Sequence, residues 1–241
     1  MGGVFLLAGA VHRLTGMGFA LIVVPPLVAL LGPHDGVTLG ALGALLASVG
    51  VGLHARGDVD RRIARSLAVT VSIGSLLGLA ISMLLPDVWL TIGVASAILA
   101  SIALVIAARF RRGGVRPPRR PERAFVVAGI ASGAMNSSSA IGGPALSVVA
   151  SWSGMAHAVF VSTVQVPFVV MGIVGVGGRF VAFGVPQVDW WGWGALVAAI
   201  VIGLAVGAAA RLVISERWAW IATLVVGAIG AISLLVGAMV G

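Results

Sequence analysis

The chain has 241 residues, of which 60% are hydrophobic and 9% are charged, and its mean hydropathy is +1.16. This composition excludes an ordinary soluble domain and predicts a polytopic, all-α membrane protein. The net charge of +8 comes from arginines clustered beside apolar segments, which indicates cytoplasmic loops rather than a nucleic-acid surface. Cysteine is absent, which excludes disulfides, thiolate catalysis and cysteine-based metal sites.

Six apolar segments are long enough to cross the hydrocarbon core as helices, which takes about 20 residues. They lie at roughly 37–55, 66–85, 88–108, 158–178, 190–210 and 218–240. Six of the seven tryptophans fall near the start of a segment and are expected to form an interfacial belt. Two other apolar stretches, 2–33 and 124–156, would each be about 50 Å long as one straight helix, against a core of about 30 Å. Each must therefore break or turn back inside the membrane.

The first long stretch contains HRLTGMGFALIVVPP at 12–26, in which polar residues run directly into glycine. Burying Arg13 there costs at least about 2.5 kcal/mol unless it finds a partner, water or an interface. We expect Arg13 to face a cavity and attract an anionic solute; snorkelling to the membrane surface is the alternative. His12 is a candidate carrier of a coupling proton because its unperturbed pKa is about 6.5, and a packed or interfacial histidine is the alternative.

An internal repeat links the two parts of the chain. A shift of 129 residues superposes identical residues, among them Asp60 on Asp189, Trp89 on Trp218, and Gly74 and Gly78 on Gly203 and Gly207. The repeat predicts an N-terminal unit at 1–108, an Arg- and Pro-rich cytoplasmic linker at 109–123, and a C-terminal unit at 124–241. The repeated Gly-xxx-Gly spacing puts two glycines on one helix face, which favours close helix packing over contact with solute.

The second long stretch contains NSSSAIGGP at 136–144, which is poor helix and poor lipid-facing surface. A half-helix that begins at such a break directs unpaired N–H groups and its positive dipole end into a cavity. We therefore predict a substrate site that draws on both stretches and on one polar residue of the span at 158–178. Its residues are Arg13, Thr15, Gly16, Gly18, Asn136, Ser137, Ser138, Ser139, Gly142, Gly143 and Gln165. One or two of the three serines are expected to bond their own helix instead, and an interhelical hydrogen bond is the alternative for Gln165.

Two arrangements of the repeats fit the sequence. Broken single spans give parallel units with four crossings each, whereas re-entrant hairpins give inverted units. The inverted arrangement puts thirteen arginines inside and only Arg179 outside, while the parallel one puts twelve inside. We favour inverted units, each a broken or re-entrant segment followed by three transmembrane helices, because opposed hairpins recur in transporters. All seven carboxylates lie in loops or at span ends, which argues against a buried carboxylate relay.

Three motifs, in this order, resemble the TauE/SafE family of membrane permeases, also called the sulfite exporter family. They are LTGMGFALIVVPPL at 14–27, GDVDRR at 57–62 and GIASGAMNSSSAIGGPAL at 129–146. The likeness covers nearly the whole chain. It implies a multi-pass permease of the bacterial cytoplasmic membrane that exports small sulfur-containing anions such as sulfite or organosulfonates.

We therefore predict a secondary transporter that works by alternating access around a midplane site between the repeats. A passive anion channel and a carrier for other small organic anions are alternatives. An intramembrane serine hydrolase, with His12 or His157 as base, is a remote alternative because no serine lies in a Gly-x-Ser-x-Gly context. We expect an anionic solute and the lipid bilayer as partners, with a homodimer left open, and no enzyme activity, cofactor, metal or nucleic acid.

Overall fold

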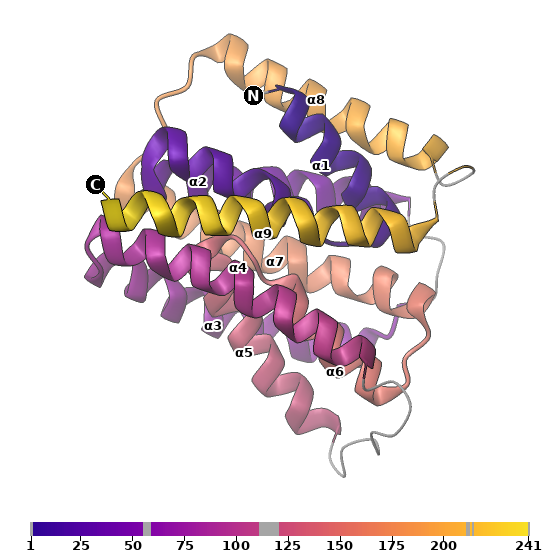
Figure 1. The fold of residues 1–241 in the computed structure, drawn as a ribbon. Helices are drawn as coiled ribbons and strands as arrows, with labels where there is room; N and C mark the ends of the chain where they lie inside the picture. The colour runs from indigo at the N-terminus through magenta and orange to yellow at the C-terminus, as the bar shows by residue number, and fades with distance from the viewer. Residues whose placement is uncertain (1, 55–58, 111–120, 211–212, 214, 241) are drawn as a thin grey trace.

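A computed structural model describes residues 2–54, 59–110, 121–210, 213 and 215–240 (Figure 1). Its regular structure is helical throughout this part of the chain. The helices are α1 (Gly2–Thr15), α2 (Phe19–Leu53), α3 (Arg61–Leu84), α4 (Asp87–Phe110), α5 (Pro121–Ser139), α6 (Gly143–Ser153), α7 (His157–Phe183), α8 (Trp190–Ala210) and α9 (Glu216–Val240). Six of these described helices are long and apolar enough to cross a membrane, which confirms the six predicted spans.

Both long apolar stretches are interrupted, as predicted. The first breaks between α1 and α2, where Gly16 and Gly18 have φ angles of 76° and 105°. The second breaks between α5 and α6, where Ala140 has a φ of 60°. Helix α2 then bends at Gly32, whose φ of 81° is non-helical, so its first limb is a short half-helix and its second limb is a span.

The repeated glycine pairs hold helices together, which confirms the packing interpretation. A Cβ atom placed on Gly74 or Gly78 of α3 would lie 2.1 Å from the carbonyl oxygen of Ile130 or Ala134 on α5. The backbones of α3 and α5 therefore touch at these positions. Close packing of backbones is a main source of helix association in the membrane. The hydrophobic effect does not drive helices together there, because lipid tails are as apolar as the helix surfaces.

The same contact recurs between α8 and α1. A Cβ on Gly203 or Gly207 of α8 would lie 2.3 or 2.4 Å from the carbonyl oxygen of Leu6 or Ala10 on α1. Gly203 and Gly207 follow the glycine pair of α3 by 129 positions, whereas Ile130 and Ala134 of α5 follow Leu6 and Ala10 by 124 positions. Each first half-helix thus packs on a helix from the other half of the chain.

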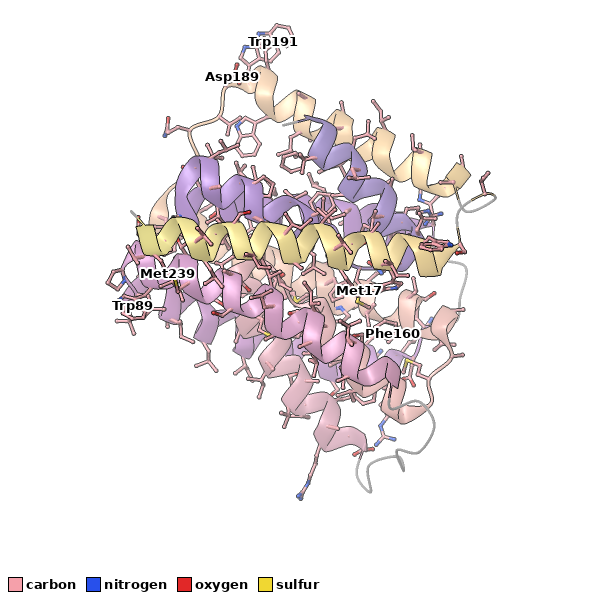
Figure 2. The ribbon with its side chains drawn as sticks, viewed as in Figure 1. Met17, Trp89, Phe160, Asp189, Trp191 and Met239 are labelled. Atoms are coloured by element: carbon pink, nitrogen blue, oxygen red, sulfur yellow. The ribbon has the colours of Figure 1, made fainter. Side chains whose placement is uncertain are left out.

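Two pairs of helices, each with one member from either half of the chain, run in opposite directions. Gly52 of α2 faces Gln165 of α7, and Leu45 faces Gly172, so residue numbers rise along α2 as they fall along α7. Helices α4 and α9 pack on each other and also run antiparallel (Figure 1). Figure 2 shows Trp89, in the first turn of α4, at the same end of the molecule as Met239 of α9.

The outer surface of the bundle is apolar, and most tryptophans whose exposure is described lie on it. Trp89, Trp190, Trp191 and Trp218 are exposed, as the predicted belt requires. Trp220 is different, because its side chain is buried in a core cluster with Met17 and Phe168. The belt prediction is therefore wrong for Trp220, since a residue two positions after Trp218 points to the opposite face of the helix.

Candidate functional site

The two breaks meet at a single cavity. Its lining comes from the first break, the long limb of α2, the second break, α7 and α9. The lining residues are His12, Met17, Gly18, Phe19, Ala20, Leu21, Ala41, Ala44, Leu45, Ser48, Asn136, Ala140, Ile141, Gly142, Gly143, Pro144, Phe168, Met171, Gly172 and Trp220. Met17 is labelled in Figure 2, on the chain between α1 and α2.

The cavity fits a small solute. Its volume is about 40 Å³, measured as the space open to the centres of water molecules. One water needs about 10–15 Å³ on this measure, so about three waters, or a solute of similar size, fit inside. The lining includes no carboxylate, so no described wall of the cavity repels an anion by charge.

His12 supplies an unused polar group to the cavity. Its side chain is 3% exposed, and neither ring nitrogen has a hydrogen-bond partner among the described residues. The ring meets the ring of Phe19 edge to face at 6.2 Å, which fixes its orientation without engaging either nitrogen. A buried polar group without a partner is costly, so a bound water or solute is expected to satisfy it.

Asn136 faces the same cavity from the other half of the chain. It lies two residues after Ala134, as His12 lies two residues after Ala10, so the two residues occupy equivalent places on α5 and α1. The Asn136 amide nitrogen donates to the carbonyl oxygen of Met171 at 3.4 Å, which ties it to α7. An amide and an imidazole can both donate to an oxyanion.

Two half-helices begin at the cavity wall. Gly18 and Gly142 precede α2 and α6, and neither helix has a side-chain cap. The first residues of each helix line the cavity, including Phe19 and Gly143. Uncapped first-turn N–H groups and the positive ends of two helix dipoles therefore act on the same small volume, an arrangement that favours negative charge.

Several predicted site residues serve the breaks rather than the cavity wall. The Thr15 hydroxyl lies within hydrogen-bond distance of the carbonyl oxygens of Val11 and Met17, which share its one proton, and so it closes the end of α1. Ser138 and Ser139 donate to backbone oxygens one turn earlier in α5, at 2.8 Å and 2.6 Å. These two serines bond their own helix, as expected of one or two of the three. Gly16 is not among the lining residues either, and its positive φ angle terminates α1.

Three other predicted residues lie close to the breaks without lining the cavity. The Gln165 amide donates to the carbonyl oxygen of Val161 on its own helix at 3.0 Å, and to that of Gly16 at the first break at 3.4 Å. The Ser137 hydroxyl is buried and has no partner among the described residues. Arg13 packs with its Cβ towards Gly207 of α8.

Sequence reasoning missed two buried residues on the long helices. Trp220 lines the cavity, and its position two residues after an exposed tryptophan is the signal that identifies its inward face. Arg179 is 0% exposed near the end of α7. A lone arginine within an apolar run is the sequence signal for such a residue, but its position near a span end favoured a surface location.

Comparison with known proteins identifies the chain's family. The family model described as Sulfite exporter TauE/SafE matches residues 1–236. No curated protein and no solved structure gave a significant match. The match spans nearly the whole chain, and six described helices are able to cross a membrane. The chain therefore belongs to the TauE/SafE family and is a multi-pass membrane transporter rather than an enzyme.

Proposed function

We propose that the protein is a secondary transporter that exports a small sulfur-containing anion, such as sulfite or an organosulfonate, across the bacterial cytoplasmic membrane. The observation that carries this proposal is the meeting of two uncapped half-helix N-termini at one cavity beside His12 and Asn136. Backbone N–H groups and neutral donors suit an oxyanion, and the cavity volume suits one of about four heavy atoms. The family description, which names sulfite, agrees with this chemistry.

The transporter is proposed to consist of two inverted units, 1–108 and 124–241, joined by a cytoplasmic linker at 109–123. Part of that linker, 111–120, lies outside the described residues. The antiparallel course of α2 against α7 and of α4 against α9 supports inversion, because equivalent helices of parallel units share one direction. Helix α1 of the first unit packs on α8 of the second, and α5 of the second unit packs on α3 of the first. This reciprocal packing supports a two-fold relation between the units.

In this topology α1 with the first limb of α2, and α5 with α6, are re-entrant hairpins that enter from opposite sides. Each hairpin carries one break, and the breaks meet at the site. The half-helix before each break packs on a helix of the other unit, α8 or α3. Rocking one unit against the other therefore exposes the site alternately to the two sides of the membrane, which is alternating access.

The anion site is proposed to consist of the residues that line the cavity. His12 and Asn136 donate through their side chains, and the first turns of α2 and α6 donate through their backbones. His12 is also the coupling candidate, since it is the only titratable residue among the described lining. If His12 takes up a proton while the site is open to one side of the membrane and releases it while the site is open to the other, each transport cycle moves one proton as well as the anion.

A charge reversal at the cavity wall tests this proposal. Asn136→Asp keeps the shape of the side chain and adds a negative charge about 4 Å from the solute, which costs about 4 kcal/mol at an effective dielectric constant of 20. We expect the Kd of sulfite to rise at least about 100-fold and saturable flux of radiolabelled sulfite into proteoliposomes to cease. Asn136→Ala is the matched control without the charge and should lose about tenfold.

Equal binding by wild type and Asn136→Asp would refute the site. The same assay, run with sulfite, sulfate, thiosulfate, sulfoacetate, taurine and simple carboxylates, identifies the substrate class. If the wild type binds only carboxylates, the substrate is an organic anion without sulfur. Flux that never saturates with substrate identifies a passive channel instead of a carrier.

A further inference from the structure

Helix α7 buries a guanidinium in the membrane-spanning bundle, beyond the cavity. Arg179 is 0% exposed and is the largest of the fully buried side chains that are described. Its Nε donates to Thr38 Oγ1 at 2.8 Å, and its Nη2 donates to the carbonyl oxygen of His34 at 2.9 Å. Its Nη1 donates to the carbonyl oxygen of Ser137 at 2.8 Å and to Ser82 Oγ at 3.4 Å.

These four acceptors come from three helices, α2, α3 and α5, and Arg179 itself stands on a fourth. One guanidinium thus ties α2 and α3 of the first unit to α5 and α7 of the second. All four acceptors are neutral oxygens. Among the described residues no carboxylate lies within ion-pair distance of Arg179, and Asp35 acts on it only at longer range.

A buried cation held only by neutral oxygens is a strong binding group for an anion. An oxyanion brings a full negative charge to the guanidinium, which the hydroxyl and carbonyl acceptors lack, and it can accept two parallel hydrogen bonds at once. An oxyanion that reaches Arg179 therefore outcompetes the hydroxyl and carbonyl acceptors. Release of Thr38, His34 or Ser82 in this exchange also breaks a hydrogen bond that joins the two units.

Arg179 is connected to the anion cavity along two elements. On α7 it follows Gly172, a lining residue, by two helical turns, which is about 11 Å. On α5 its acceptor Ser137 directly follows the lining residue Asn136, and a Cβ on Gly175 would lie 2.8 Å from the buried Ser137 hydroxyl. Polar groups thus continue from the cavity to the guanidinium without an intervening apolar layer on α5.

Three side chains, in contact one after another, lead from Arg179 to the surface at the end of the bundle away from the arginine-rich start of α3. The Phe183 ring lies 5.1 Å from the guanidinium carbon, and the His34 ring packs on Phe183 at 4.1 Å. His34 Nε2 lies 3.1 Å from Asp87 Oδ1, whose side chain is exposed. In the inverted topology this is the outer end of the transporter.

We propose that Arg179 is the residue that selects for anions at the outer gate of the transport path. This proposal rests on the proposed function of the cavity. With the gate closed, the guanidinium binds the neutral oxygens of Thr38, His34, Ser82 and Ser137. An anion arriving from the cavity replaces them, and the units are then free to separate at their outer ends.

Substitution of Arg179 tests the charge. In proteoliposomes with radiolabelled sulfite, Arg179→Gln is expected to lower Vmax/KM at least about 100-fold, while Arg179→Lys, which keeps the charge, stays within about tenfold of wild type. Arg62→Gln is the matched control. The Arg62 side chain is 84% exposed, and its ion pair with Glu122 lies at the start of α3, far from Arg179. Wild-type flux in Arg179→Gln, or equal loss in folded Arg179→Lys and Arg179→Gln, would overturn the proposal.

Substitution of Thr38 tests the exchange of acceptors even if Arg179→Gln fails to fold. Thr38→Val removes a neutral acceptor that competes with the anion, so KM for sulfite should fall about threefold or more. A merely structural role for the bond predicts a lower thermal midpoint and an unchanged or higher KM, and that result overturns the proposal. If the wild type transports no sulfur-containing anion, the proposed function is wrong. If the wild type transports one but the Arg179 and Thr38 variants do not show the expected changes, only the proposed role of Arg179 at the gate is wrong.

Discussion

The contact between α3 and α5 offers a prediction whose size follows from the geometry. Replacing Gly78 by alanine puts a Cβ 2.1 Å from the carbonyl oxygen of Ala134, where ordinary contacts begin near 3.4 Å. The two backbones must therefore separate by about 1.3 Å, because a carbonyl oxygen within a helix has no side-chain freedom with which to move aside. Overpacking of this kind costs about 1–3 kcal/mol.

A second glycine isolates this cost. Gly93 lies within α4, and a Cβ added there meets nothing within 4 Å. Gly78→Ala and Gly93→Ala gain the same helix propensity, about 1 kcal/mol, so the difference between them reports the clash. At about 2–4 °C per kcal/mol for a chain of this size, Gly78→Ala should melt about 2–12 °C below Gly93→Ala.

Thermal unfolding in detergent measures the stability difference, and sulfite titration measures its effect on the site. Asn136 lies two residues beyond Ala134 on α5, so a shift of α5 displaces it at the cavity wall. We expect Gly78→Ala to weaken sulfite binding about tenfold, which corresponds to about 1.4 kcal/mol. Equal melting of the two variants would show that α3 and α5 are not in backbone contact, and the packing argument would fail with it.

Further predictions concern the breaks and the cavity. Ala140→Gly should raise the thermal midpoint by a few degrees, because alanine at a φ of 60° is strained by about 1–2 kcal/mol, and Gly16→Ala should lower it, since φ there is 76° and a Cβ would meet Val161 at 2.9 Å. His12→Leu should abolish coupling of sulfite flux to an imposed pH gradient, and retention of that coupling would exclude His12 as the proton carrier. Arg13→Gln should reduce sulfite flux less than Asn136→Asp does, since Arg13 is not among the lining residues. A greater loss in Arg13→Gln would show that Arg13 belongs to the anion site.

The breaks could be predicted from the sequence because their signals are local. Glycine tolerates positive φ, serine and asparagine compete with helical backbone bonds, and proline starts a new helix. Of the residues that the sequence predicts for the site, Gly18, Asn136, Gly142 and Gly143 line the cavity. The packing role of the glycine pairs could also be predicted, because a spacing of four puts both glycines on one helix face whichever helix packs there.

The assignment of charge to the site could not be predicted in the same way. Arg13 stands beside a break in the sequence, but the helix rotates it towards α8 and presents His12 to the cavity instead. Arg179 stands far from both breaks in the sequence, yet its acceptors are Thr38 and Ser137, 141 and 42 positions away. Which side chain meets which is decided by tertiary packing, which local patterns do not encode.

The two halves of the chain align with two different shifts, and this alignment pairs His12, the candidate proton carrier, with Asn136. A shift of 129 superposes α3 on α8, but only a shift of 124 superposes the breaks, which then aligns His12 with Asn136 and Gly16 with Ala140. Gly16 and Ala140 both have a left-handed backbone. Two residues later the breaks differ, because Gly18 has a φ of 105° and Gly142 a φ of −98°. Their polar side chains differ, because an imidazole can change its protonation near neutral pH and an amide cannot. In the proposed transporter, a site with this asymmetry would bind the anion from either side but exchange a proton only through the first hairpin, so the two access states would differ in energy.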